Sequence, residues 1–255
     1  MLKTRVNELL GIKHPVLQGA MAWISGWEMT VAVSKAGGLG TIASATMEPE
    51  KLIEHISKVR GETGNPFAVN IPLRLPSSKK AAQIAMSEEV PVVVSSAGDP
   101  GIYTEGFKRK GIKALQVVFT LDMVKRCREV GVDGIIAMGM EGGGNINPAE
   151  LSTFVLVREA VEETDLPVIA AGGIADAQGL VAALALGAEG VQMGTRFWRP
   201  RKGRSMTGTR RRLSVQKIQT PWSLEGQQAF NSGSLKTDLR ERYFGWRGRD
   251  EQGTR

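Results

Sequence analysis

Eight short apolar runs recur along the first 197 residues, and segments of helical length lie between them. The runs are residues 15–21, 38–43, 67–73, 90–97, 114–119, 134–138, 167–172 and 190–197. The segments with the apolar spacing of an amphipathic helix include residues 27–35, 49–59, 79–87, 121–130, 152–163 and 177–186. The runs show almost no polar alternation, which is typical of parallel strands buried on both faces. This pattern predicts a (β/α)8 TIM barrel, with a doubly wound open sheet as the alternative.

The charge divides the chain at the end of the last run. Residues 198–255 hold 14 Lys and Arg against 5 Asp and Glu, a net charge of +9, whereas the whole chain of 255 residues carries +7. The first 197 residues therefore carry −2 by difference. We predict two parts, a barrel at residues 1–197 and an atypical basic tail at residues 198–255. Because the basic charge is confined to the tail, the composition does not favour nucleic acid as a partner.

The sequence also argues against several classes of protein. No run of about 18 uncharged apolar residues is present to span a membrane. Asn7, Glu8 and Lys13 interrupt the start of the chain, which does not fit a signal peptide. A single cysteine, Cys127, cannot form an internal disulfide, and this fits the cytoplasm. Cysteine, histidine and carboxylate residues show no ligand cluster, so we expect no metal site, and Cys127 fits a small packed residue rather than a nucleophile.

Glycines follow the last two predicted strands. Gly172 and Gly173 come directly before a helix that Asp176 can cap and Gly187 can end, and Gly194 precedes Thr195. Glycines let backbone N–H groups approach an anion, and in barrels the loops after strands seven and eight often hold a phosphate. The spacing therefore indicates a phosphate site, with ordinary tight turns as the alternative. The glycines at 37, 38 and 40 do not form a dinucleotide-binding loop and fit the end of a helix.

Five segments together carry a resemblance to a known family. They are residues 14–23 (HPVLQGAMAW), 34–40 (SKAGGLG), 141–145 (EGGGN), 167–174 (PVIAAGGI) and 190–197 (GVQMGTRF). In this order they resemble the FMN-dependent barrel enzymes that comprise nitronate monooxygenases, formerly called 2-nitropropane dioxygenases, and type II enoyl-acyl-carrier-protein reductases. The resemblance covers residues 8–197. It implies an FMN-dependent oxidoreductase that oxidises nitronates with oxygen or reduces enoyl thioesters with NAD(P)H.

The resemblance also implies where the cofactor lies. FMN would lie across the barrel mouth, with its phosphate on Gly172, Gly173, Gly194 and Thr195. The isoalloxazine ring would be lined by Ala20, Met21, Asn70 and the loop at Glu141.

One position departs from the family pattern. The loop after the sixth strand usually reads Glu-(Ser/Ala)-Gly-Gly-His, and its histidine handles a proton or orients the substrate, whereas this chain has Asn145 there. Asn145 cannot take a proton near neutral pH. The remaining histidines, His14 and His55, fit scaffold or surface positions. We therefore expect weakened or rerouted proton chemistry, and the alternative function is a catalytically weak or silent barrel that binds flavin or phosphate.

The tail has three interpretations. Its basic residues and its tryptophans at 198, 222 and 246 could bind nucleic acid or an acidic partner, or it could be a solvated, disordered extension. It could also be a frameshift product, because a shifted frame beginning near Phe197 can encode strings that resemble what the family has after strand eight. The sequence leaves the oligomeric state open, with a homodimer as one option.

Overall fold

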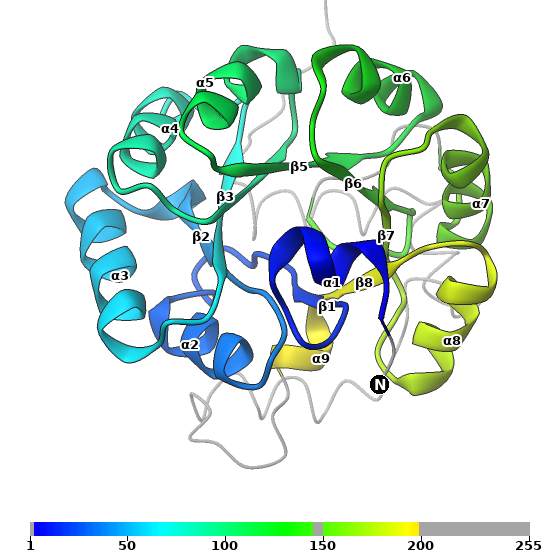
Figure 1. Ribbon diagram of the computed structural model, residues 1–255, viewed down its shortest axis with the longest axis horizontal. Coiled ribbons are helices and arrows are strands. Elements are labelled where there is room, and N and C mark those ends of the chain that lie inside the picture. Colours follow the sequence, from blue (N-terminus) through cyan, green and yellow to red (C-terminus); the bar gives the residue numbers. More distant parts are fainter. Residues whose placement is uncertain (1–2, 145–149, 199–255) are drawn as a thin grey trace, which may run out of the picture. The chain divides into compact units, whose positions relative to one another are not determined.

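Eight parallel strands form a ring with helices on its outside, as Figure 1 shows for the computed structural model. The structure describes residues 3–144 and 150–198, all within one compact unit, Met1–Pro200. The strands are β1 (Val16–Gln18), β2 (Gly40–Ala43), β3 (Phe67–Pro72), β4 (Val92–Ser96), β5 (Lys113–Val118), β6 (Gly134–Met138), β7 (Val168–Ala171) and β8 (Gly190–Met193). The principal helices are α1 (Arg5–Leu10), α2 (Trp27–Lys35), α3 (Pro49–Glu62), α4 (Ser78–Ser87), α5 (Thr104–Arg109), α6 (Leu121–Val130), α7 (Thr153–Glu163), α8 (Ala177–Ala185) and α9 (Thr195–Trp198).

The order of the strands confirms the barrel prediction. Each strand from β2 to β8 pairs in parallel with the next, and β1 pairs with β8. A bridge between Leu17 and Leu39 joins the two remaining edges, where the Gln18 N–H donates to the Leu39 carbonyl at 2.9 Å. The ring is therefore a nearly closed (β/α)8 barrel, and the open-sheet alternative does not hold.

The apolar residues form an interior and an outer layer. Side chains such as Leu17, Leu39, Val94 and Ile136 fill the barrel, and other buried side chains lie between the strands and the outer helices. Both faces of the strands are thus buried, which explains why the sequence runs showed so little polar alternation. None of the described helices is long and apolar enough to cross a membrane.

The sequence predicted most elements closely and overran the ends of two strands. The bounds of α2, α6 and β6 agree with the predicted ranges, but the run predicted to residue 21 ends as a strand at Gln18 and the run predicted to residue 197 ends at Met193. Thr195 to Trp198 form the short helix α9, because Gly194 breaks the strand. Helices α1 and α5, each of 6 residues, were missed because they are too short to show a clear helical period.

Predicted helix ends are confirmed. The Asp176 carboxylate accepts a hydrogen bond from the Gly179 N–H at 2.9 Å at the start of α8, and Gly187 after its end has φ of +97°. The glycines after α2 have a packing role as well, since an added Cβ on Gly40 would lie 2.2 Å from the Thr30 carbonyl oxygen. Only glycine lets α2 approach β2 this closely.

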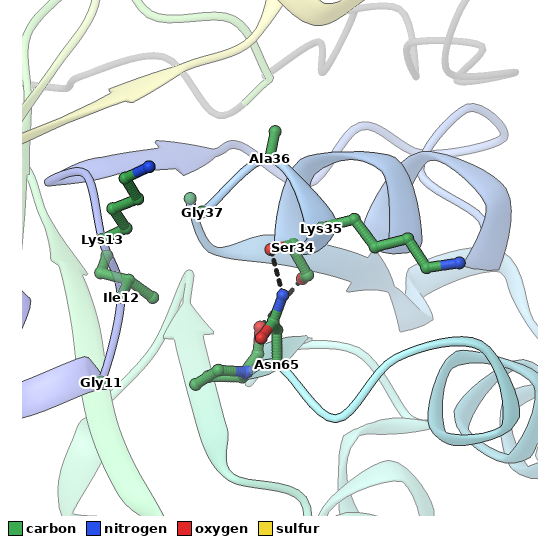
Figure 2. A pocket seen from close by; sticks show the side chains of 10 residues that line it. Gly11, Ile12, Lys13, Ser34, Lys35, Ala36, Gly37 and Asn65 are labelled. Atoms are coloured by element: carbon green, nitrogen blue, oxygen red, sulfur yellow. Dashed lines mark hydrogen bonds between the residues drawn. The ribbon is translucent and has the colours of Figure 1, made fainter.

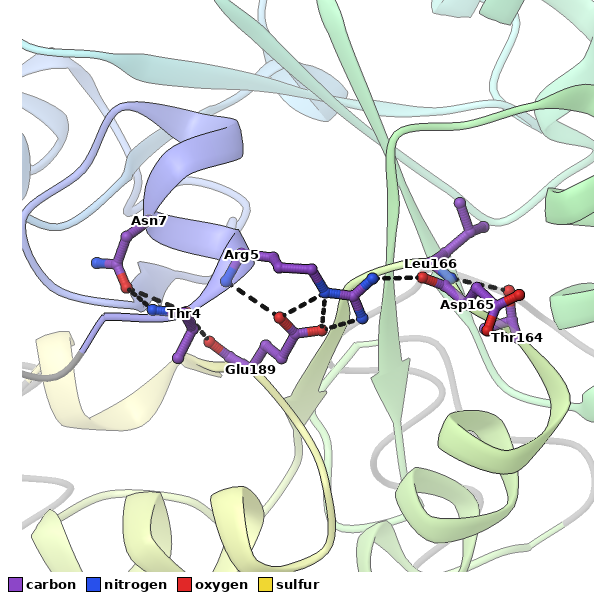
Figure 3. Close-up of polar contacts among 7 residues, drawn as sticks. All are labelled: Thr4, Arg5, Asn7, Thr164, Asp165, Leu166 and Glu189. Carbon is purple, nitrogen blue, oxygen red and sulfur yellow. Dashed lines mark hydrogen bonds and ion pairs between the residues drawn. The ribbon is translucent and has the colours of Figure 1, made fainter.

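Helix α1 covers the amino end of the barrel, where Val6 and Leu10 join the interior core. Figure 3 shows how it is held: the Arg5 guanidinium donates to both Glu189 carboxylate oxygens and, at 2.7 Å, to the Asp165 carbonyl. The Thr4 hydroxyl donates to the Glu189 carbonyl at 2.6 Å. These contacts tie the first helix to the segments that lead into β7 and β8 and close this end of the barrel.

Candidate functional site

The residues predicted to bind a ligand all lie at the carboxyl ends of the strands, or one to three residues beyond them. Ala20 and Met21 follow β1, Asn70 is in β3, and Glu141 follows β6. The glycines at 172 and 173 follow β7, and Gly194 and Thr195 follow β8. The carboxyl ends of all strands in a closed parallel barrel face one side, so the fold brings these distant positions to one mouth.

The loop after β7 presents free backbone donors. Gly172 and Gly173 have φ of +108° and +68°, a region that favours glycine. Among the described residues, no acceptor pairs with the N–H groups of Gly172, Gly173 or Gly194. Gly172 and Gly194 are half-buried and Gly173 is exposed, so a ligand can reach these three donors at adjoining strand ends, and an anion such as phosphate fits them. Asp176 itself caps α8, so the glycine N–H groups, rather than that helix end, are the available donors.

Glu141, in the loop after β6, forms a fixed contact with the start of α7 beside the β7 loop. One carboxylate oxygen, Oε2, accepts hydrogen bonds from the Thr153 N–H and from the Thr153 hydroxyl, each at 2.8 Å. Thr153 is the first residue of α7, so Glu141 satisfies one of the unpaired N–H groups at that helix start. An added Cβ on Gly173 would lie 3.4 Å from the Glu141 Cβ, which places the two residues in contact.

The loop after β1 is held by a serine. The Met21 N–H donates to the Ser25 hydroxyl oxygen at 2.9 Å, and the same hydroxyl oxygen accepts from Gln18 Nε2 at 2.8 Å. The Met21 sulfur lies 3.9 Å from the position of a Cβ on Gly194, so the β1 and β8 loops are neighbours at the mouth. This contact brings Ala20 and Met21 beside the β8 glycine.

Asn70 lies farther around the mouth, on β3. Its Nδ2 donates to the Val94 carbonyl at 2.9 Å and to the Ser96 hydroxyl at 3.2 Å, while the Ser44 hydroxyl donates to the Asn70 carbonyl at 2.6 Å. Its Oδ1 has no partner in the described part of the chain. The side chain is buried and fixed, with one acceptor left over.

Sequence reasoning missed Trp23. Its side chain is 82% exposed in the loop after β1, and its backbone φ is +68°, which is rare for a bulky residue. A strained, exposed aromatic residue beside a candidate site is a common feature of ligand-binding loops. Composition gave no signal for it, because backbone strain is set by the tertiary fold.

Two hollows lie at opposite ends of the barrel. One of about 660 Å³ lies beyond β3, β4 and β5, with Leu73, Phe119, Met123 and Ile102 on its walls and Arg74 and Arg126 beside them. Figure 2 shows the other, of about 250 Å³, between the end of α2 and the segments around Lys13 and Asn65. There Asn65 Nδ2 donates to the Ser34 carbonyl at 3.0 Å, a scaffold contact at the amino end. Only the first hollow lies on the face where barrels carry their sites.

The remaining predicted residues have separate outcomes. Asn145 and residues 199–255 lie outside the described residues. His55 is a scaffold residue, because its Nδ1 accepts the Trp27 N–H at 3.0 Å. Cys127 is fully buried, and burial raises the pKa of its thiol to about 12. Groups of three or more candidate metal ligands are absent from the part of the chain that the structure describes.

The fold defines an α/β barrel, and the comparisons with known proteins identify its family. A model of the nitronate monooxygenase family matches residues 3–218, a longer range than the residues 8–197 of the resemblance. The chain therefore belongs to the nitronate monooxygenase family.

Individual proteins are similar over the same region. The chain is 36% identical over 196 residues to a Rhodococcus jostii (3aS,4S,5R,7aS)-5-hydroxy-7a-methyl-1-oxo-octahydro-1H-indene-4-carboxyl-CoA dehydrogenase, covering 77% of this chain and 55% of that protein. It is 32% identical over 242 residues to a probable nitronate monooxygenase of Staphylococcus saprophyticus, covering 77% and 68%. The structure of FabK from Thermotoga maritima matches with a TM-score of 0.75 and 47% identity, covering 77% and 63%. The chain thus spans about half the length of the first of these curated relatives.

Proposed function

We propose that this protein is an FMN-dependent oxidoreductase whose cofactor phosphate binds the N–H groups after β7 and β8. The observation that carries the proposal is the set of unpaired N–H groups at Gly172, Gly173 and Gly194, two of them on residues with positive φ. Thr195 adds an exposed hydroxyl donor at the start of α9. Backbone donors without side chains in front of them suit a phosphate, and family membership favours FMN over other phosphates.

The other mouth residues would then face the ring of the flavin. The loop at Ala20 and Met21 is close to Gly194 and is rigidly held by Ser25, so its backbone can pack on the ring. Asn70 keeps Oδ1 free to accept a hydrogen bond from a ring N–H. By the resemblance, the loop at Glu141 would line the ring as well. When bound, FMN supplies the redox chemistry, taking electrons from NAD(P)H or a nitronate and passing them to an enoyl thioester or to oxygen.

The substrate would extend into the hollow beyond β3, β4 and β5. Its volume of about 660 Å³ is within the range of small-molecule sites, and its apolar walls at Leu73, Phe119 and Met123 suit a hydrocarbon part of the substrate. Arg74 makes no ion pair with a described residue, and it stands where an acidic group of the substrate could be bound. An enoyl thioester uses such a hollow more fully than a small nitronate does.

Asn145 favours a second candidate, the catalytically weak or silent barrel. A neutral amide at the position of the family histidine can orient a substrate by hydrogen bonding, but it cannot accept the proton that general-base catalysis requires. Flavin binding does not require a residue that accepts this proton, so the cofactor could still bind. A protein that binds FMN but turns over neither a nitronate with oxygen nor an enoyl thioester with NAD(P)H would have this second function.

The first test is the visible absorption spectrum of the purified full-length protein, with the released chromophore identified. Stoichiometric FMN, or uptake of added FMN, is the expected result. A matched pair of variants then tests the phosphate site: Gly173→Asn and Gly173→Asp are similar in shape, and both residue types tolerate a φ of +68°. The added carboxylate should weaken FMN binding relative to the amide because it repels the phosphate. Equal affinities of the two variants for FMN would show that Gly173 does not contact the phosphate.

The frameshift hypothesis for the tail is tested separately by the coding DNA. A shifted frame that stays open and continues the family pattern beyond Phe197 would support it, and early stop codons would refute it.

A further inference from the structure

Thr153 occupies the space between the ends of β6 and β7. An added Cβ on Gly139 would lie 2.1 Å from the Thr153 nitrogen, and one on Gly172 would lie 2.5 Å from the Thr153 hydroxyl oxygen. Neither contact is compatible with a side chain, so both glycines are needed to admit the threonine. Thr153 is thereby in direct contact with one of the residues proposed to bind the phosphate.

The Thr153 hydroxyl has more acceptors than protons. Its Oγ1 lies 2.8 Å from Glu141 Oε2 and 3.1 Å from both the Ala171 and the Gly172 carbonyl oxygens. A hydroxyl carries one proton, so it donates to one of the three at a time. An ionised carboxylate is the strongest acceptor of the set, and it also binds the Thr153 N–H. Glu141 therefore determines how the threonine is oriented against Gly172.

The charge of Glu141 is balanced by helix α7. This helix has 11 residues, and the carboxylate sits on the N–H of its first residue, where the helix dipole favours negative charge. The same side chain packs on Gly173, 3.4 Å from the position of its Cβ. One carboxylate thus contacts Gly173 directly and Gly172 through Thr153.

We propose that Glu141 and Thr153 are positioning residues that hold Gly172 and Gly173 in their positive-φ conformation and so set the contribution of the phosphate to cofactor affinity. This inference rests on the proposed function, because it assigns the pair a role toward the FMN phosphate. It adds to the ring-lining role that the resemblance implies for the loop at Glu141, because the side chains of Glu141 and Thr153 would act on the phosphate end of the cofactor.

The experiment compares two flavins that differ only in the phosphate. Dissociation constants of FMN and riboflavin are measured by fluorescence titration of the full-length, flavin-free protein, and their ratio reports the phosphate contribution alone. The variants are Glu141→Gln, Glu141→Ala, Thr153→Val and the conservative Thr153→Ser. Glu159→Gln is the control, because Glu159 is an exposed residue of the same helix. A general loss of structure would weaken both flavins together and leave the ratio unchanged.

We expect wild-type protein, Thr153→Ser and Glu159→Gln to share one preference for FMN over riboflavin. Glu141→Ala and Thr153→Val should reduce that preference about tenfold or more, because each removes the hydrogen bond from the Thr153 hydroxyl to the Glu141 carboxylate, and a hydrogen bond to a charged group is worth about tenfold or more in an equilibrium constant. Glu141→Gln should fall between, since a neutral amide oxygen is a weaker acceptor.

Four results would overturn the inference. An unchanged preference in Glu141→Ala and Thr153→Val would show that the pair is only structural. A stronger preference for FMN in Glu141→Gln would show that the carboxylate repels the phosphate instead of ordering its site. Wild-type protein that binds both flavins equally would refute the phosphate site itself, and wild-type protein that binds neither would refute the proposed function together with the inference.

Discussion

The side chain of Gln18, at the end of β1, accepts a hydrogen bond from the backbone N–H of Thr41 in β2 at 2.9 Å. These two strands share only the bridge between Leu17 and Leu39, so a side-chain amide provides a hydrogen bond that a longer strand pair would have made with its backbone. The Nε2 of Gln18 donates to the Gly19 carbonyl and to the Ser25 hydroxyl. One buried amide therefore adds to the backbone bridge that closes the barrel and also orders the loop that follows β1.

Replacing Gln18 should destabilise the barrel. Gln18→Leu keeps the volume but leaves the buried Thr41 N–H unpaired, and we expect a loss of about 1–3 kcal/mol in the free energy of unfolding. Urea denaturation measures this loss. Thr41→Val is the matched control, because the Thr41 hydroxyl is buried without a partner among the described residues, and its removal should cost little. A Gln18→Leu variant as stable as the wild type would show that the junction between β1 and β2 does not need the Gln18 amide.

His55 should make stability depend on pH. Burial is the largest cause that lowers its pKa, with Lys51 and Lys58 also lowering it and Glu28 and Glu54 opposing them. The neutral ring is needed, because Nδ1 accepts the Trp27 N–H at the start of α2. A group with a lowered pKa binds more protons in the unfolded chain, so stability falls as the pH drops below about 6.5.

The variant His55→Asn tests this dependence. Asparagine can present an acceptor near the position of Nδ1 but does not titrate, so the loss of stability between pH 7.5 and pH 5.5 should become smaller than in the wild type. His14→Asn, at an exposed position, is the control. If both variants lose as much stability as the wild type over this range, His55 is not the responsible group.

Cys127 should be inert in the folded protein. Its thiol is fully buried and has a pKa raised to about 12, with burial as the first cause and the charge of Asp99 as the second. Only the thiolate reacts quickly, so labelling by a disulfide reagent at pH 8 should be slow under native conditions and fast in urea. Rapid labelling of the folded protein would mean that helix α6 opens readily and that the raised pKa of Cys127 does not control how fast its thiol reacts.

Asn145→His should restore proton transfer if the position serves that purpose. General acid–base catalysis commonly contributes about 10²–10⁴ in rate, so we expect turnover of a nitronate, or of an enoyl thioester with NAD(P)H, to rise toward that extent. Asn147→His places the same side chain two residues away and is the control. No gain in Asn145→His, with FMN bound normally, would refute the assignment of proton handling to this position.

Much of the architecture could be predicted from local patterns. The helix from Trp27 to Lys35 and the strand from Gly134 to Met138 follow from apolar spacing, and the cap by Asp176 follows from its place before a helix. The predicted run to Phe197 was too long, because an apolar pattern does not distinguish a strand from a short helix that begins after Gly194. The glycines after β7 could be recognised as a candidate phosphate site. The sequence alone could not distinguish such a site from ordinary tight turns.

The sequence by itself determined the alternation of strands and helices, because apolar spacing depends on residues close together in the chain, and its five motifs indicated the family. The tertiary structure alone decided that Gln18 closes the barrel onto Thr41, that Glu141 holds Thr153, and that Trp23 adopts a strained conformation. These contacts join segments that meet only when eight strands form a ring, and no periodic pattern of side chains encodes a hydrogen bond between residues so far apart.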